Sequence, residues 1–376
     1  MAKRWVVSAD SHVVEPDDLF TKALGKKWDV EKLPRIVKSY KGEKGPWLFA
    51  GKEYILLAGT LDVGDDAEML KKANEDPSIR LQCLDKDGVW AEVLFATTTM
   101  LAMRSPDNLV ARDCTRVFND WMIEYCQQAP HRLYGAAMIH MDDPAWATKE
   151  LKKVAKAGLR CAMINTDMRP EWKHAYQDKA YDKFWSVAQE LGMPIMIHIV
   201  AGNKRDPFTT HGHEKKDIAR MLIDLFTDGP ITLATEFIFG GIMDRFPRLK
   251  LVLGEYELSW YPYWLFRAEQ VADIFVPMIG GKKVKKSVRD YMKRVGQGVI
   301  DDPFASVGID LIDINTLMWG SDFPHPRCTY PNSLKLIDEK FGHLGPGVVE
   351  KITITNAARF YNIDLPKEMR MKAAAE

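Results

Sequence analysis

The sequence has little cysteine and no long apolar run. Its five cysteines, an odd number, are scattered and form no CxxC or zinc-finger spacing, which indicates a reduced chain without a disulfide framework. No run approaches the roughly 18 apolar residues that a membrane span requires. The N-terminal MAKRWVVSADSH contains no apolar stretch long enough for a signal peptide. We therefore expect a cytoplasmic protein that does not interact with membranes.

An excess of charge of either sign is also missing. The chain has 52 basic and 52 acidic side chains, so its formal net charge is zero. A nucleic-acid-binding protein needs a basic face, so we expect no nucleic-acid partner and interpret the lysine-rich segment 282–286 as a solvated loop. A glycine-rich nucleotide loop between a strand and a helix is absent, and so is a G-x-S-x-G nucleophile elbow. These two kinds of enzyme site are therefore excluded.

What the sequence does contain is a regular alternation of β-rich runs and helix-length amphipathic segments, with 46% hydrophobic and 28% charged residues. Such alternation is typical of parallel α/β folds. We predict an α/β fold, a distorted (β/α)8 TIM-like barrel that forms a single domain over residues 1–376. Residues 26–77 are interpreted as an insertion over the barrel mouth that contains a β-hairpin. The strands are predicted at residues 4–9, 91–96, 133–139, 159–164, 194–199, 249–253, 295–300 and 316–319.

Polar residues that can bind metals stand at the strand ends where a TIM barrel carries its catalytic groups. The first strand ends in Asp10-Ser11-His12, and the two-residue period of a strand places Asp10 and His12 on one face. His198 ends the fifth strand, and Asp322 follows the eighth. Taken singly, each residue has an ordinary structural interpretation, such as a capping aspartate or a core histidine. Together they favour a metal site.

Two imidazoles and two carboxylates suit Zn²⁺, Mn²⁺ or Fe²⁺ better than Ca²⁺ or Mg²⁺. We predict a divalent ion, with zinc favoured and manganese or iron as the alternatives. An ion with an open position lowers the pKa of bound water toward ~7, and Asp322 can accept a proton from that water. The predicted ligands are Asp10, His12, His198 and Asp322.

Four segments resemble the amidohydrolase-related family that includes aminocarboxymuconate-semialdehyde decarboxylase: Ala9–Pro16, Phe246–Lys250, Trp319–His325 and Asn356–Arg359. The chain is more similar to an Asp-x-His…Glu-Pro branch of this family than to its characterised decarboxylases. The resemblance implies a distorted (β/α)8 barrel and a divalent metal, usually zinc or manganese. It also implies cleavage of C–N, C–O or C–C bonds, often decarboxylation. Carried over by position, it implies the same four metal ligands.

Two positions depart from the family's pattern. The well-studied decarboxylases carry a histidine just after the sixth strand, where this sequence has Glu255. A glutamate can act as a general base or a metal ligand, but not as a cationic acid. Dinuclear relatives bridge two ions with a carboxylated lysine after the fourth strand, whereas residues 161–165 contain no lysine. A carbamate-bridged pair of ions is therefore excluded unless a lysine comes from elsewhere.

The barrel mouth contains more potential ligands than one ion needs, so a second ion is a further expectation. Glu15 and Glu255 are predicted as additional metal ligands, or alternatively as carboxylates that accept the N–H of a ligand histidine. His211 and His213 are expected on a loop. Catalytic roles are assigned to Asp322, Glu255 and His325, and substrate contacts to His140 and Arg327.

Three functional hypotheses follow. The leading one is a metal-dependent hydrolase or lyase of the amidohydrolase superfamily that acts on a small organic acid or amide through a metal-bound water. The second is a non-heme, dinuclear iron oxygenase component on the same barrel, and the third is a metal-bound, non-catalytic partner subunit. Aromatic residues in the segment 260–266 favour a homo-oligomer, or a hetero-oligomer with a related chain.

Overall fold

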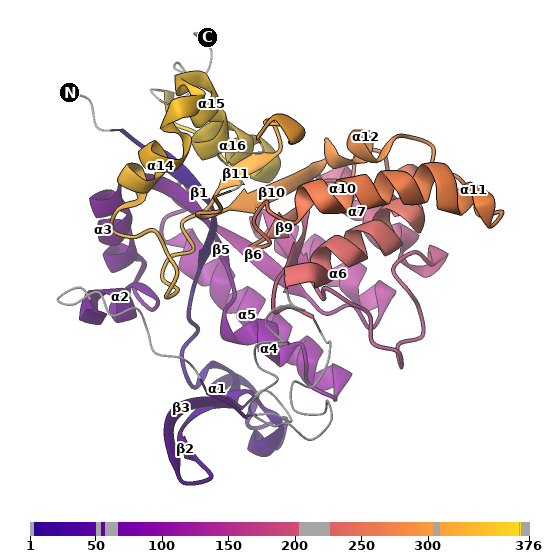
Figure 1. Cartoon of the computed structure of the whole chain (residues 1–376). Coiled ribbons are helices and arrows are strands. Elements are labelled where there is room, and N and C mark those ends of the chain that lie inside the picture. Colours follow the sequence, from indigo (N-terminus) through magenta and orange to yellow (C-terminus); the bar gives the residue numbers. More distant parts are fainter. Residues whose placement is uncertain are drawn as a thin grey trace.

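Eight parallel strands form one sheet that curls into a nearly closed barrel (Figure 1). A computed structural model describes residues 4–49, 54–56, 67–202, 226–303, 309–367 and 369. Within these residues the strand order follows the sequence, β1-β5-β6-β7-β8-β9-β10-β11, so the predicted distorted (β/α)8 fold is confirmed. The strands are β1 Val6–His12, β5 Val89–Phe95, β6 Leu133–Ile139, β7 Cys161–Ile164, β8 Ile195–His198, β9 Leu251–Gly254, β10 Val295–Val299 and β11 Leu317–Trp319.

The barrel closes between β1 and the segment after β11. The backbone N–H of Asp322 donates to the carbonyl of Asp10 at 3.0 Å, and that of His12 donates to the carbonyl of Phe323 at 2.7 Å. The first and last strands are thereby held together at the level of the predicted metal ligands. Three buried hydroxyls that lie 2.9, 3.0 and 3.1 Å from one another brace the same junction, those of Ser8, Ser11 and Ser321.

Helices cover the outside of the barrel (Figure 1). Each of α3, α5 and α6 follows an aspartate whose side chain accepts a backbone N–H of the first turn, which is the usual reason for a helix to begin there. The longer helices are α3 Pro77–Asp87, α5 Asn108–Gln127, α6 Pro144–Lys156, α7 Asp182–Leu191, α10 Tyr261–Gln270 and α14 Ser333–Phe341. The shorter helices are α1 Leu19–Leu24, α2 Ala67–Ala73, α4 Thr98–Ala102, α9 Ile242–Arg245, α11 Val276–Met278, α12 Val288–Met292, α15 Pro346–Glu350 and α16 Asn356–Tyr361.

A second, antiparallel sheet lies within the segment predicted as an insertion. Its strands are β2 (Arg35–Tyr40), β3 (Glu43–Phe49) and β4 (Tyr54–Leu56). β3 pairs with β4, and β2 is an additional strand that the sequence pattern does not indicate. Leu48 of β3 shares a small apolar cluster with Leu101 of α4, a helix that follows the carboxyl end of β5. The sheet therefore contacts the end of the barrel that carries the predicted site, while the domain limits 1–376 and 26–77 stay a prediction.

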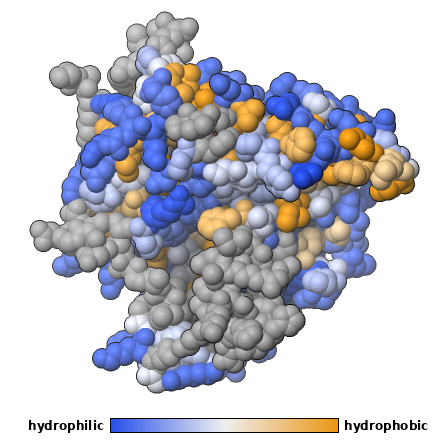
Figure 2. All heavy atoms as spheres, viewed as in Figure 1, coloured by the Kyte–Doolittle hydropathy of each residue, from blue (hydrophilic) through white to orange (hydrophobic). Residues whose placement is uncertain are grey.

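Apolar side chains are exposed along α10 and its continuation. After α10 the chain continues as a π-helical segment, Val271–Phe275, into α11. Figure 2 shows apolar atoms at the outer end of this helix. The exposed fractions are 68% for Tyr263, 54% for Phe266, 69% for Met278 and 76% for Ile279. Such a surface is typical of association sites, although the predicted oligomer stays a prediction. None of the described helices combines the length and the apolar character that a membrane crossing requires.

Candidate metal centre

The four predicted ligands meet inside the mouth of the barrel. β1 extends beyond its predicted end through His12, because Ser11 and His12 pair with β5, so Asp10 and His12 belong to the strand itself. His198 is the last residue of β8, and Asp322 follows β11. All four ligand residues are buried, with exposed fractions of 3% or less. Residues from the two ends of the chain and from its middle are therefore assembled in one place.

Two glycines allow this close approach. A Cβ atom at position 320 would lie 2.6 Å from Cβ of Asp10, and one at position 254 would lie 2.5 Å from Cδ2 of His198. Side chains do not tolerate such distances, so Gly254 and Gly320 make room for the ligand side chains. Close approach of neighbouring groups is a common reason for glycine at a fixed position.

Each of the four ligand residues has a buried atom without a hydrogen-bond partner: Oδ1 of Asp10, Nε2 of His12, Nε2 of His198 and Oδ1 of Asp322. Nε2 of His12 lies 3.5 Å from Oδ1 of Asp10 and 3.6 Å from Oδ1 of Asp322. Nε2 of His198 lies 3.6 Å from Oδ2 of Asp10. These separations are long for hydrogen bonds. They approach the spacing of about 3.4 Å between two ligands that each lie about 2.1 Å from a tetrahedral ion.

The orientation of both histidines suits metal binding. Nδ1 of His12 lies 2.9 Å from the carbonyl oxygen of Ala96, and Nδ1 of His198 lies 2.8 Å from that of Ile199. A carbonyl can only accept, so each Nδ1 carries a proton, and Nε2 is the nitrogen that remains to bind an ion. Ligand histidines in metal sites are commonly fixed in this way.

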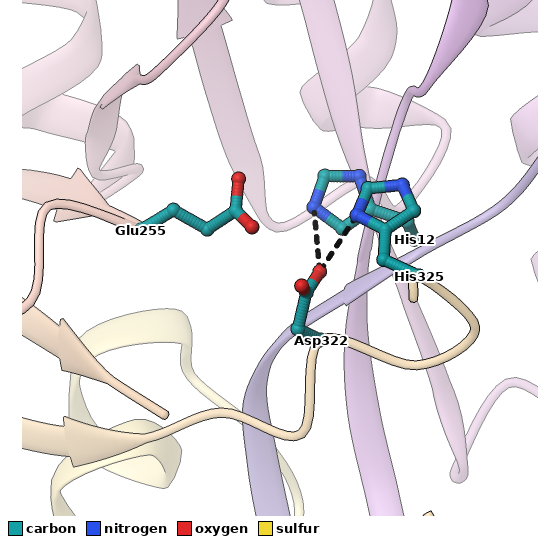
Figure 3. Close-up of side chains that lie close together, drawn as sticks. All are labelled: His12, Glu255, Asp322 and His325. Atoms are coloured by element: carbon teal, nitrogen blue, oxygen red, sulfur yellow. Dashed lines mark ion pairs between the residues drawn. The ribbon is translucent and has the colours of Figure 1, made fainter. Parts of the chain in front are cut away.

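A second group of potential ligands overlaps the first (Figure 3). The ligand atoms of His12, Glu255, Asp322 and His325 lie within 4.8 Å of one another. Nδ1 of His325 is 2.8 Å from Oδ1 of Asp322, and its ring stacks on that of His12 with centroids 4.0 Å apart. Glu255 and Asp322 both adopt left-handed backbone conformations, with φ of 60° and 55°. Such conformations are uncommon for these residues and often occur at functional sites.

The electrostatics of the pocket favour a cation. Burial raises the pKa of Asp10, but His198 lowers it further, so the net pKa lies below the ordinary range. Burial lowers the pKa of His198, whereas Asp10 raises it, to about 9 overall. Burial and then the charge of Asp322 raise the pKa of Glu255 to about 7, and burial raises that of Asp322 to about 6. Three carboxylates thus share a buried pocket in which their negative charge is costly unless a positive charge accompanies it.

Glu15, predicted as a metal ligand or as a partner of a ligand histidine, takes a different place. Its two carboxylate oxygens accept four hydrogen bonds, at 2.5 to 2.9 Å, from the backbone N–H and hydroxyl groups of Thr98 and Thr99. These threonines begin α4. Both oxygens are occupied in holding the start of this helix, so the structure does not bring Glu15 together with the other predicted ligands.

The two predicted substrate residues also have other partners. His140 is fully buried, with Nε2 3.3 Å from Oδ1 of Asn108, and it belongs to neither ligand group. Arg327 donates to Glu257 at 2.6 Å and to Asp301 at 3.2 Å, so its guanidinium joins two loops of the barrel mouth. Nδ1 of His140 has no hydrogen-bond partner, and the substrate contacts expected of these two residues stay a prediction. His211 and His213 lie outside the described residues.

Three further residues, which the sequence does not single out, surround the ligands: Thr97, Arg80 and Glu92. Thr97 Oγ1 lies 3.0 Å from Nε2 of His325. Arg80 and Glu92 form a fully buried ion pair, and the guanidinium of Arg80 lies 4.9 Å from the ring centroid of Phe323, the residue after Asp322. A charged residue such as Glu92 inside an otherwise apolar predicted strand is the sequence signal that indicates a buried counter-ion.

Comparison with known proteins agrees with this architecture. Residues 93–363 match the family model described as amidohydrolase. A gamma-resorcylate decarboxylase of Polaromonas sp. is 25% identical over 256 residues, which are 65% of this chain and 74% of that protein. An amidohydrolase from Mycobacterium avium subsp. paratuberculosis superposes with a TM-score of 0.76 at 18% identity, over 96% of this chain and 100% of the other.

A second solved structure adds a metal to the comparison. It is a 5-carboxyvanillate decarboxylase from Novosphingobium aromaticivorans in complex with manganese and 4-hydroxy-3-methoxy-5-nitrobenzoic acid. It superposes with a TM-score of 0.68 at 17% identity, over 96% of each chain. At these identities both superpositions establish the fold alone. The family match spans well over half of the chain, and the chain therefore belongs to the amidohydrolase family.

Proposed function

We propose that this enzyme is a divalent-metal-dependent decarboxylase of a small aromatic carboxylic acid. Membership of the amidohydrolase family makes it a metal-dependent enzyme, which sets aside the predicted non-catalytic subunit. The relatives found by sequence are named as decarboxylases. They offer no support for the predicted iron oxygenase. Of the two reactions in the leading hypothesis, carbon–carbon cleavage is therefore preferred to hydrolysis.

The observation that carries the proposal is the set of four buried atoms without partners, on Asp10, His12, His198 and Asp322. Buried polar atoms are normally paired, and a metal ion satisfies all four together. Two imidazole nitrogens and two carboxylates form a donor set that suits manganese or zinc. When bound, the ion would supply a Lewis acid that holds the substrate's oxygen atoms and stabilises developing negative charge.

The metal named in the neighbouring structure is manganese, so we propose Mn²⁺ as the first ion to test. The sequence favours zinc. Nothing in the donor set separates the two, because both bind imidazole and carboxylate. A comparison of activity with each ion after removal of bound metal decides between them.

The remaining site residues face the open side of the pocket. The side chains of Glu255 and His325 are 14% and 20% exposed, whereas those of the first ligand group are 4% exposed or less. Decarboxylation replaces the carboxylate of the ring by a proton and releases CO2. It therefore requires a proton source but no oxidant or reductant. Glu255 and His325 are the protonatable groups that a substrate in the mouth would meet first.

The experiment is a turnover assay of the purified chain in the presence of Mn²⁺. Gamma-resorcylate and 5-carboxyvanillate are the first substrates, since the relatives are named for them, and matching amides and esters test hydrolysis. In D2O the product of decarboxylation should carry deuterium at the carbon that lost CO2. His198→Ala should abolish the reaction, whereas His131→Ala, at an exposed position, should not. Turnover of amides or esters without turnover of any aromatic acid would refute decarboxylation and favour the hydrolase.

A further inference from the structure

We propose that the pocket holds a second divalent ion beside the first, bound by Glu255, Asp322 and His325. This inference rests on the proposed function, which supplies the first ion. A lysine carbamate is not needed for it, because the bridging groups are carboxylates already present in the pocket.

The first argument is the number and grouping of ligand atoms. The described residues contain two overlapping groups, and in each the ligand atoms lie within 4.8 Å of one another. Only His12 belongs to both groups, and it has a single nitrogen to offer because its Nδ1 faces the carbonyl of Ala96. If His12 serves the first ion, three side chains remain for another: Glu255, Asp322 and His325.

The second argument is the contact between His325 and Asp322. Nδ1 of His325 lies 2.8 Å from Oδ1 of Asp322, yet Oδ1 has no hydrogen-bond partner. The short contact is therefore not made in hydrogen-bond geometry. Two ligand atoms that lie side by side and face a common point produce such a contact. Figure 3 shows the carboxylate of Glu255 directed toward the same space.

The third argument is the protonation of His325. Its Nε2 lies 3.0 Å from Oγ1 of Thr97, a hydroxyl that can accept the Nε2–H. Nδ1 then keeps its lone pair and faces the carboxylates. This is the same arrangement, with an outer partner fixing the ring, that His12 and His198 show at the first position.

The fourth argument is charge. Asp10, Glu255 and Asp322 bring three carboxylates together, and one divalent ion compensates only two of them. A second ion compensates the third, which otherwise either remains charged at a cost or takes up a proton. Asp322 lies 3.6 Å from His12 and 2.8 Å from His325, and Glu255 lies 3.6 Å from His198. Both carboxylates thus contact the two groups and can bridge the ions.

The two positions should differ in affinity. The second has three protein ligands, at least one of which it shares, and it lies on the exposed side of the pocket. Fewer ligands and more solvent leave positions open for substrate oxygens and make this ion easier to remove. When bound to this ion, Glu255 and His325 cannot donate the substrate's proton directly, so the second ion excludes a proton-donor role for them. The Mn²⁺ stoichiometry of their variants distinguishes a ligand from a proton donor.

The test is a titration of chelator-treated full-length protein with Mn²⁺, followed by calorimetry and by elemental analysis after dialysis. The wild type should bind two equivalents, the second more weakly. Glu255→Gln and His325→Ala should each retain one tight equivalent, and His131→Ala should match the wild type. The electron paramagnetic resonance signal of Mn²⁺ should broaden between one and two equivalents, because neighbouring spins interact.

The outcomes separate this inference from the proposed function. Saturation of the wild type at one equivalent, lost in His198→Ala, would overturn the second ion and leave the first in place. Retention of two equivalents by both Glu255→Gln and His325→Ala would also overturn it. Failure of the wild type to bind any Mn²⁺ or Zn²⁺ would overturn both.

Discussion

Replacement of Glu15 by alanine should destabilise the fold without removing metal. Glu15 is 2% exposed, and its oxygens accept four hydrogen bonds from Thr98 and Thr99 at 2.5 to 2.9 Å. Neither oxygen belongs to a ligand group. The variant therefore separates a structural carboxylate from a metal ligand, at a position for which the sequence leaves ligation and a partner role open.

The cost of Glu15→Ala follows from the groups left without partners. The two threonine hydroxyls can rotate toward other acceptors, but the two backbone N–H groups at the start of α4 cannot. Each buried donor without an acceptor costs about 1–3 kcal/mol, and the lost carboxylate at a helix N-terminus adds about 0.3–1 kcal/mol. We expect a loss of about 3–6 kcal/mol in the free energy of unfolding. Glu15→Gln keeps one acceptor oxygen, so it should lose roughly half of this.

The assay is urea unfolding followed by circular dichroism and tryptophan fluorescence, with metal content measured on the same samples. Asp17→Asn, at an exposed position two residues away, is the control and should change stability by no more than about 0.5 kcal/mol. Glu15→Ala with wild-type stability would refute the reasoning. So would a loss of metal with unchanged stability, because it would return Glu15 to the ligand set.

Two further predictions concern buried charge. Arg80 and Glu92 are fully buried partners, so Arg80→Met should cost about 3–5 kcal/mol in urea unfolding. Addition of Glu92→Leu to Arg80→Met should recover most of that loss. An Arg80→Met variant as stable as the wild type would contradict the buried ion pair. Burial lowers the pKa of His140 well below its ordinary value of 6.5, so below about pH 6.5 the unfolded chain binds a proton that the folded chain does not. The free energy of unfolding should therefore fall as the pH drops from 7 to 5, and His140→Gln should remove up to about 1.4 kcal/mol per pH unit of that fall. The same pH dependence of unfolding in the wild type and in His140→Gln would contradict this role of His140.

Local rules in the sequence account for the barrel and for the gathering of the first ligands. Ile195–His198 is an apolar run that ends in one histidine, and Asp10 and His12 alternate along one strand. The period of a strand and the common direction of parallel strands bring such residues to one mouth. These features depend on neighbours along the chain, and the sequence displays them directly.

The roles that the sequence assigns less well depend on distant partners. Glu15 is paired with Thr98 and Thr99, which lie 83 and 84 positions further along the chain. Arg327 is paired with Glu257, which lies 70 positions before it. Each residue type is equally suited to ligation, substrate binding or a structural contact. Only the fold determines which partner lies within reach, so these assignments require the three-dimensional structure.

The most direct test of the account is the metal content of three proteins purified without chelator and loaded with Mn²⁺. These are the wild type, His198→Ala and the exposed control His131→Ala. The account predicts at least one equivalent of bound ion in the wild type and in His131→Ala, and none held tightly by His198→Ala, although all three proteins fold. Full metal content in His198→Ala would contradict the assignment of Asp10, His12, His198 and Asp322 as the ligands of a divalent ion.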